Sequence, residues 1–163
     1  MISFIRVDDR IIHGQIVTRW SKEFPCDGII AVNDKAATTP VLKKSFVAST
    51  EKKVFIWTAE EFREKCEKVK ESPKKYFLIT KNPVDMARIL VDEKFVPNDV
   101  KRVVIGPCND RPGAIKLGQN QSITQEEAEA CEKMTNAGYD VYFALLQETA
   151  IGSWPKFRSK FGY

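Results

Sequence analysis

Short apolar runs alternate with helix-like stretches along most of the chain. The candidate strands are ISFIRV, GIIAV, KVFIW, YFLI and RVVIG, and the stretches of helical character between them are GQIVTRWSKEF, TPVLKKSFVAS, AEEFREKCEKVK and PVDMARILVDEKF. Such alternation is typical of βαβ units, in which parallel strands are joined by crossover helices. The pattern predicts an α/β fold with an open, mostly parallel twisted sheet.

The last third of the chain adds a helix and a strand to this pattern. The segment TQEE, from Thr124 to Glu127, fits a capping box, and Gly138 suits the left-handed end of the helix that the box opens. YDVYFALL predicts a last strand, for which an antiparallel place at the sheet edge stays open. The basic, aromatic tail GSWPKFRSKFGY is expected to pack loosely at the surface or against a partner. With no repeat or long linker, residues 1–163 are expected to form one domain.

Composition narrows the class of protein. No run approaches the roughly 18 apolar residues of a membrane span, and the start MISFIRVDDR lacks the layout of a signal peptide, so we expect a cytoplasmic chain. The four cysteines form no C-x-x-C pair and accompany a single histidine, so neither a metal site nor another cofactor is expected. The net charge of +4 comes from interspersed signs, which argues against a nucleic-acid partner.

Polar residues follow each predicted strand. The five loops begin DDRIIHG, NDK, TAEE, TKN and GPCNDR. In an open parallel sheet these loops meet at the carboxyl edge, where ligands bind. Asn33 and Asp34 in the second loop are expected to bind phosphate or substrate there, and Arg111 in the fifth loop is expected to reach an anion. That fifth loop, IGPCNDRPG, lacks the lysine of a nucleotide-binding phosphate loop.

His13, the only histidine, falls in the first of these loops. It could cap a turn by donating one hydrogen bond to a carbonyl, or it could carry chemistry. Asp8 and Asp9 can orient an imidazole and fix its tautomer. Because adjacent residues of a strand face opposite ways, at most one of the two carboxylates is expected to point at His13. Arg10 offers a forked donor for an oxyanion.

A helix predicted to start near Gly14 and Gln15 adds backbone donors beside the histidine. Its first N–H groups lack partners within the helix and favour an anion, and Gly14 allows a bulky group to approach the backbone. An arginine, free amides and a neutral imidazole together suit a histidine that accepts a phosphoryl group, because such transfer depends mainly on positioning and charge neutralisation.

The segment RVDDRIIHGQIVTRW resembles the active-site segment of the enzyme IIB component of the mannose/fructose/sorbose class of bacterial sugar phosphotransferase systems. IIAVND and the stretch from VVIGPCND to GYDVYF resemble later parts of the same family, so the likeness covers nearly the whole chain. One departure is the sequence Gly106, Pro107, Cys108, where relatives commonly have two glycines and a methionine; the conformation of this loop is therefore left open.

The resemblance implies a protein-phosphohistidine–sugar phosphotransferase with helices on both faces of its sheet. A phosphorylated IIA protein or domain would phosphorylate His13 on Nδ1, Arg10 would stabilise the phosphoryl group with Asp9 beside it, and the phosphate would pass to a sugar carried by membrane IIC and IID subunits. The protein would be cytoplasmic and peripherally associated with that transporter, with a monomer and a homodimer both open.

Two other readings stay open at this point. One is a regulatory phosphocarrier of the same fold that does not feed a transporter. The other is an unrelated α/β protein that binds nucleotides or acids in the same crevice. The sequence does not identify the sugar.

Overall fold

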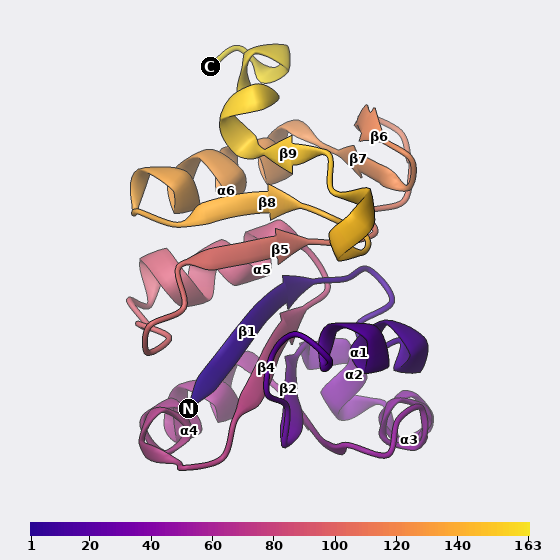
Figure 1. The fold of residues 1–163 in the computed structure, drawn as a ribbon, viewed down its shortest axis with the longest axis vertical. Helices are drawn as coiled ribbons and strands as arrows, with labels where there is room; N and C mark the ends of the chain where they lie inside the picture. The colour runs from indigo at the N-terminus through magenta and orange to yellow at the C-terminus, as the bar shows by residue number, and fades with distance from the viewer.

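The computed structural model describes residues 1–163 and builds them around a seven-stranded sheet (Figure 1). In spatial order the strands are β3 (Lys53–Trp57), β2 (Gly28–Val32), β4 (Tyr76–Thr80), β1 (Ile2–Val7), β5 (Arg102–Ile105), β8 (Asp140–Phe143) and β9 (Gly152–Ser153). The first six run parallel, and β9 pairs antiparallel with β8. The predicted sheet is confirmed, but its antiparallel edge strand is β9, whereas the segment YDVYFALL supplies the parallel strand β8.

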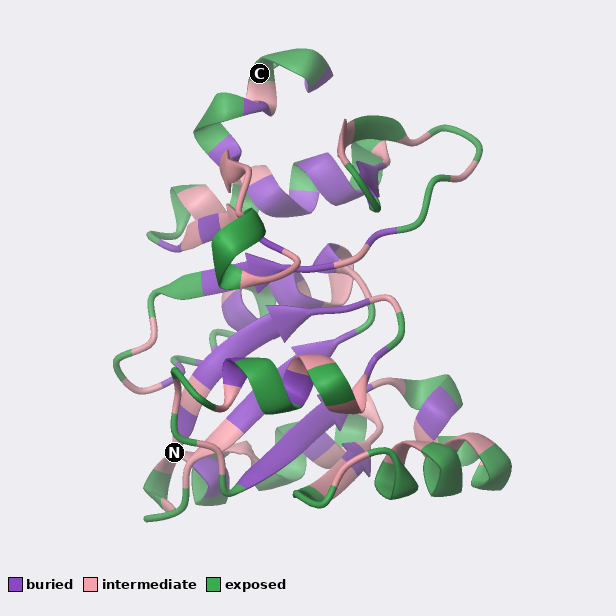
Figure 2. Cartoon of the chain, turned by 45° about the vertical axis from the view of Figure 1, so that its right-hand side comes forward, coloured by how far each residue is buried: buried purple, intermediate pink, exposed green.

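Helices cover both faces of this sheet, as expected. On one face lie α1 (Gly14–Trp20), α2 (Asp34–Thr38) and α3 (Pro40–Ala48); on the other lie α4 (Ala59–Glu71), α5 (Pro83–Ala87) with a π-helical turn (Arg88–Asp92), and α6 (Gln125–Asn136). Each face has its own apolar cluster, and the central strands β1, β2 and β4 between them are mostly buried, whereas the edge strands β3 and β9 are partly exposed (Figure 2). None of the helices combines the length and apolarity needed to cross a membrane.

Strand β1 shows how the two faces are separated. Phe4 joins the cluster under α1, whereas Ile5 and Val7 join the cluster under α5 and α6. This is the alternation expected of successive residues in a strand. The same alternation decides where the polar residues that follow β1 point.

The C-terminal tail packs tightly, so the expectation of loose packing is wrong. Its two 3₁₀ turns (Trp154–Lys156 and Arg158–Phe161) bury Trp154, Phe157 and Phe161 against α6 and β8. The indole N–H of Trp154 donates to Glu132 at 2.9 Å. These aromatic residues of the tail therefore pack in the core of the chain itself.

In the same half of the chain, one predicted feature is confirmed and another element was not predicted. The predicted capping box at Thr124 is confirmed, because its hydroxyl accepts from the backbone N–H of Glu127 and the Glu127 carboxylate accepts from the backbone N–H of Thr124. A small antiparallel hairpin, β6 (Ile115–Gly118) and β7 (Gln121–Ile123), was not predicted. It follows the loop after β5 and lies beside the carboxyl edge of the sheet (Figure 1).

Candidate functional site

His13 lies at the carboxyl edge of the sheet, directly before α1. Its backbone is extended, with φ −121°, and its carbonyl accepts the first hydrogen bond of the helix from Val17 at 3.0 Å. Its side chain does not cap the helix. The imidazole Nδ1 is buried and has no hydrogen-bond partner. Nδ1 of His13 therefore donates no hydrogen bond to a carbonyl of a turn.

A strained turn connects β1 to His13. The N–H of Ile11 donates to the carbonyl of Asp8 at 2.8 Å, and the N–H of Ile12 donates to that of Arg10 at 2.8 Å. Ile11 has φ +64°, a conformation that costs a β-branched residue about 1–3 kcal/mol. Its buried side chain holds the turn in place. Nothing in the sequence signals this conformation, which turns the chain sharply back towards α1.

Asp8 is the carboxylate on the side of His13. The two residues line one small cavity of about 10 Å³ beneath α1, together with Arg6 and Trp20. Asp8 is 2% exposed. Its carboxylate accepts hydrogen bonds from three groups of Arg10: the backbone N–H (2.9 Å), Nε (3.2 Å) and Nη2 (3.3 Å). The sequence predicted that at most one of the two adjacent carboxylates faces His13, and in the structure Asp8 is the one on that side.

Arg6 is a functional candidate that sequence reasoning missed. It is 2% exposed and donates to the carbonyls of Ala144 and Leu145 at 3.1 Å each, and its Nε lies 3.6 Å from the carboxylate of Asp8. Burial lowers the pKa of Arg6 to about 10, against the opposing attraction of Asp8, so the side chain stays charged at neutral pH. The available signal was a charged residue inside a mostly apolar parallel strand.

Gly106 makes room for this arginine. A Cβ at that position would lie 2.4 Å from Nη2 of Arg6 and 2.9 Å from the carbonyl oxygen of Val7. Since Arg6 is buried and held by two carbonyls, it is not free to move aside. The unusual Gly106 to Cys108 segment therefore begins with a residue that the buried charge network requires.

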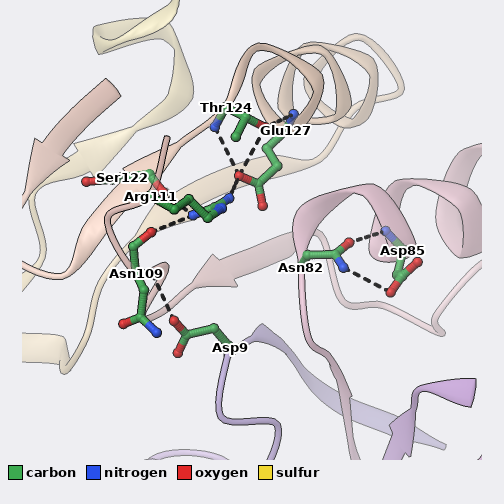
Figure 3. Close-up of polar contacts among 8 residues, drawn as sticks. All are labelled: Asp9, Asn82, Asp85, Asn109, Arg111, Ser122, Thr124 and Glu127. Carbon is green, nitrogen blue, oxygen red and sulfur yellow. Dashed lines mark hydrogen bonds and ion pairs between the residues drawn. The ribbon is translucent and has the colours of Figure 1, made fainter. Parts of the chain in front are cut away.

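Asp9 points to the opposite face, away from His13. Its carboxylate accepts from the backbone N–H of Asn109 at 2.8 Å, and it borders a polar hollow of about 630 Å³ that also includes Arg111 and Asp85 (Figure 3). Burial raises the pKa of Asp9 above its usual value. Because no hydrogen bond joins Asp9 to His13, the expectation that it acts directly on the imidazole is not supported by this geometry.

Arg111 shares that hollow with Asp9. Its guanidinium pairs with Glu127 at the start of α6 and donates to the carbonyls of Asn109 and Ser122 (Figure 3). Arg111 thus ties the loop after β5 to α6. The cavity that Arg111 lines does not include His13, and the one that His13 lines does not include Arg111.

Three of the four remaining predicted residues make contacts within the protein. The Asn33 side chain caps α2 by accepting from the N–H of Ala36 at 2.9 Å, and Asp34 accepts from the N–H of Ala59, the first residue of α4, at 2.8 Å. Gln15 is exposed. A Cβ on Gly14 would lie 2.1 Å from the carbonyl oxygen of Ser49, so the backbone that approaches Gly14 closely is that of the protein itself.

No group of three or more His, Cys, Asp or Glu side chains is arranged to hold a metal ion. The chemically distinctive group at this edge is instead a histidine with an unpaired buried nitrogen beside a chain of alternating charges, Arg6, Asp8 and Arg10. Arg10 is 41% exposed and makes no hydrogen bond through Nη1. A guanidinium held at one edge and open at the other can bind an oxyanion near His13.

Comparisons with known proteins show what the whole chain is similar to. The mannose-specific EIIAB component of the PTS system from Escherichia coli K12 is 29% identical over 147 residues, covering 86% of this chain and 43% of that protein. The chain thus spans less than half the length of this relative. The fructose-specific EIIB component from Bacillus subtilis is 28% identical over 151 residues, covering 91% of this chain and 90% of that protein.

Solved structures share the fold. That of manxB from Thermoanaerobacter tengcongensis has a TM-score of 0.84 at 24% identity, and that of the IIBSor domain of the sorbose permease from Klebsiella pneumoniae has 0.81 at 22%; each alignment covers 100% of this chain and 98% of the other. A family model described as the PTS system sorbose subfamily IIB component matches residues 2–162. Since this match spans nearly the whole sequence, the chain belongs to the sorbose subfamily of PTS IIB components.

Proposed function

We propose that residues 1–163 form the IIB domain of a sugar phosphotransferase system, in which His13 accepts a phosphoryl group from a phosphorylated IIA protein or domain and passes it to a sugar. The observation that carries this proposal is the position of the only histidine, at the carboxyl edge of the sheet with Arg10 in the same turn. The sugar would be carried by membrane IIC and IID subunits, and the protein would work at the cytoplasmic side of the membrane.

The transfer exchanges one nitrogen–phosphorus bond for another. The bond to the histidine of IIA breaks as a bond to a neutral ring nitrogen of His13 forms, and the proton of the other ring nitrogen stays in place. Arg10 can donate from Nη1 to the oxygens of the transferred group, because its other edge is held by Asp8. The backbone N–H groups of Gly14 and Gln15, which have no partner within α1, add donors.

The acceptor nitrogen in this proposal is Nδ1, which is the enclosed nitrogen of the ring. Phosphorylation there requires the imidazole to turn about its side-chain bonds; a half turn about Cβ–Cγ exchanges Nδ1 with Cδ2. Since Nδ1 has no hydrogen bond, the turn breaks none. Asp9, Asn33, Asp34 and Arg111 hold the surrounding loops in this account and take no direct part in the transfer.

Phosphorylation of the purified protein tests the proposal. The native chain and His13→Ala are incubated with phosphoenolpyruvate, the two general phosphocarriers and a cognate IIA protein. We expect acid-labile, base-stable phosphate on the native chain and none on the variant, whose fold is checked by circular dichroism. Equal labelling of both proteins, or labelling of neither by a competent IIA, would overturn the assignment of His13.

A further inference from the structure

We infer that Asp8, backed by the buried Arg6, is the positioning residue that holds Arg10 ready beside His13. Its catalytic consequence rests on the proposed function, whereas the positioning itself is a property of the unphosphorylated protein. Asp8 touches neither phosphate nor sugar in this account. It acts through Arg10.

The contacts of Asp8 fix both the main chain and the side chain of Arg10. Oδ1 accepts from the backbone N–H at 2.9 Å and from Nε at 3.2 Å, while Oδ2 accepts from Nη2 at 3.3 Å. A planar carboxylate that meets two nitrogens of one guanidinium sets its direction as well as its distance. Arg10 therefore has one orientation, in which Nη1 remains free.

Burial makes this arrangement rigid. The side chains of Asp8 and Arg6 are 2% and 3% exposed, whereas that of Arg10 is 41% exposed. Arg6 compensates the buried negative charge from 3.6 Å and is itself held by the carbonyls of Ala144 and Leu145. The order of charges thus runs from an anchored cation, through a buried anion, to a half-exposed cation, with one net positive charge next to the histidine.

This order suits the transfer of a phosphoryl group. An exposed arginine without a partner would lose side-chain entropy each time it bound the incoming phosphoryl group. An arginine that is already oriented lost this entropy when the protein folded. Asp8 and His13 line the same cavity, so the carboxylate that orients Arg10 lies close to the histidine. The carboxylate neutralises part of the charge on Arg10, but Arg6 offsets that effect.

The positioning can be measured without any phosphoryl transfer. In ¹⁵N NMR spectra, the Nε–H of Arg10, assigned with Arg10→Lys, should be as rigid as the backbone in the native protein and mobile in Asp8→Asn. Asp140→Asn is the matched control, because Asp140 binds Nε of Arg102 at 2.7 Å at the opposite end of the sheet. An Arg10 Nε–H that is equally rigid in Asp8→Asn overturns the inference.

Single-turnover transfer from phospho-IIA then measures the consequence. We expect Asp8→Asn and Arg10→Ala each to slow the maximal rate by about 10²-fold, with little change in the half-saturating concentration of IIA. The double variant should also lose about 10²-fold, because the two residues act as a unit. A double variant that loses about 10⁴-fold would show independent roles and overturn the inference.

Two further outcomes are covered: an Asp8→Asn variant that does not fold, and a native chain that is not phosphorylated. If Asp8→Asn does not fold, Asp8→Glu keeps the charge but displaces the carboxylate by one methylene, and it should slow transfer at least tenfold; a native rate there contradicts the positioning role. If the native chain is not phosphorylated at all, the proposed function fails, and the NMR measurement alone decides whether Asp8 orders Arg10.

Discussion

Replacing Gly14 by alanine is expected to destabilise the protein, although helix propensity predicts the opposite. Gly14 is the first residue of α1, and alanine within a helix is more favourable than glycine by about 0.5–1 kcal/mol. In the structure, however, the new Cβ would lie 2.1 Å from the carbonyl oxygen of Ser49, where ordinary contact begins at 3.4 Å. Either α1 or the turn after α3 must move by more than 1 Å.

The cost of that movement decides the sign. Ser49 directly follows α3 and its N–H donates to the carbonyl of Phe46 at 3.2 Å, so the clashing oxygen belongs to ordered backbone and not to a flexible side chain. Overpacking of this kind costs about 1–3 kcal/mol, occasionally more. Set against the gain in propensity, the net loss in the free energy of unfolding should be about 1–2 kcal/mol.

Urea unfolding of Gly14→Ala measures this loss. Thr18→Ala, on the exposed side of the same helix, is the control and should lie within about 0.5 kcal/mol of the native protein. Because His13 directly precedes Gly14, the displaced helix should also slow phosphorylation of His13 in the glycine variant. A Gly14→Ala protein that is as stable as the native one, or more stable, would refute the contact on which this reasoning depends.

Three other measurements follow from buried or partly buried groups. Trp154→Ala should lower the free energy of unfolding by about 3–5 kcal/mol, since its ring is wholly buried; a loss below about 1 kcal/mol in urea would contradict the packing of the tail. Burial raises the pKa of Asp9 above 3.8, so the native protein loses stability as pH rises and this carboxyl ionises. Asp9→Asn does not ionise, so its free energy of unfolding should rise relative to that of the native protein between pH 4 and pH 7. A difference between the two proteins in urea unfolding that does not change with pH would refute the shift. Burial raises the pKa of Cys108 to about 12, so this thiol should react with a disulfide reagent at pH 8 only after unfolding, and rapid labelling of the folded protein, located by peptide mapping, would argue against its burial.

Three strands could be predicted with exact bounds. Ile2–Val7 and Gly28–Val32 are apolar runs because central strands covered by helices on both faces bury nearly every side chain, and the edge strand Lys53–Trp57 is apolar enough to be recognised although it is only partly buried. Helix ends were harder to predict. The helical pattern of residues 14–24 stops at Trp20, and that of residues 83–95 becomes a short α-helix followed by a π-helical turn.

Elements held mainly by tertiary contacts escaped prediction. Strand β9 has only two residues and exists through its pairing with β8, and Gln121 in β7 donates from its side chain to the carbonyl of Ile105. The tail looked like a surface segment because Lys and Arg alternate with its aromatic residues. Its aromatic side chains are nevertheless the ones that close the core.

The site was predicted in part. The loop of His13 and Arg10 followed from the placement of polar residues after strands, and the alternation of β1 limited the carboxylates facing His13 to one. The choice of Asp8 over Asp9 depends on the register of β1 between its two neighbours. The left-handed turn at Ile11 could not be predicted, because a β-branched residue disfavours it and only the packed surroundings hold it there.

A chase of the phosphorylated protein tests directly whether His13 passes its phosphate to a sugar. The chain labelled on His13 is isolated and mixed with membranes that contain the cognate IIC and IID subunits, with and without sugar. If His13 relays phosphate to a sugar, label should leave the protein only when sugar is present and should be recovered as sugar phosphate. Label that stays on His13 in the presence of sugar and competent membranes would contradict the relay and favour a regulatory phosphocarrier of the same fold.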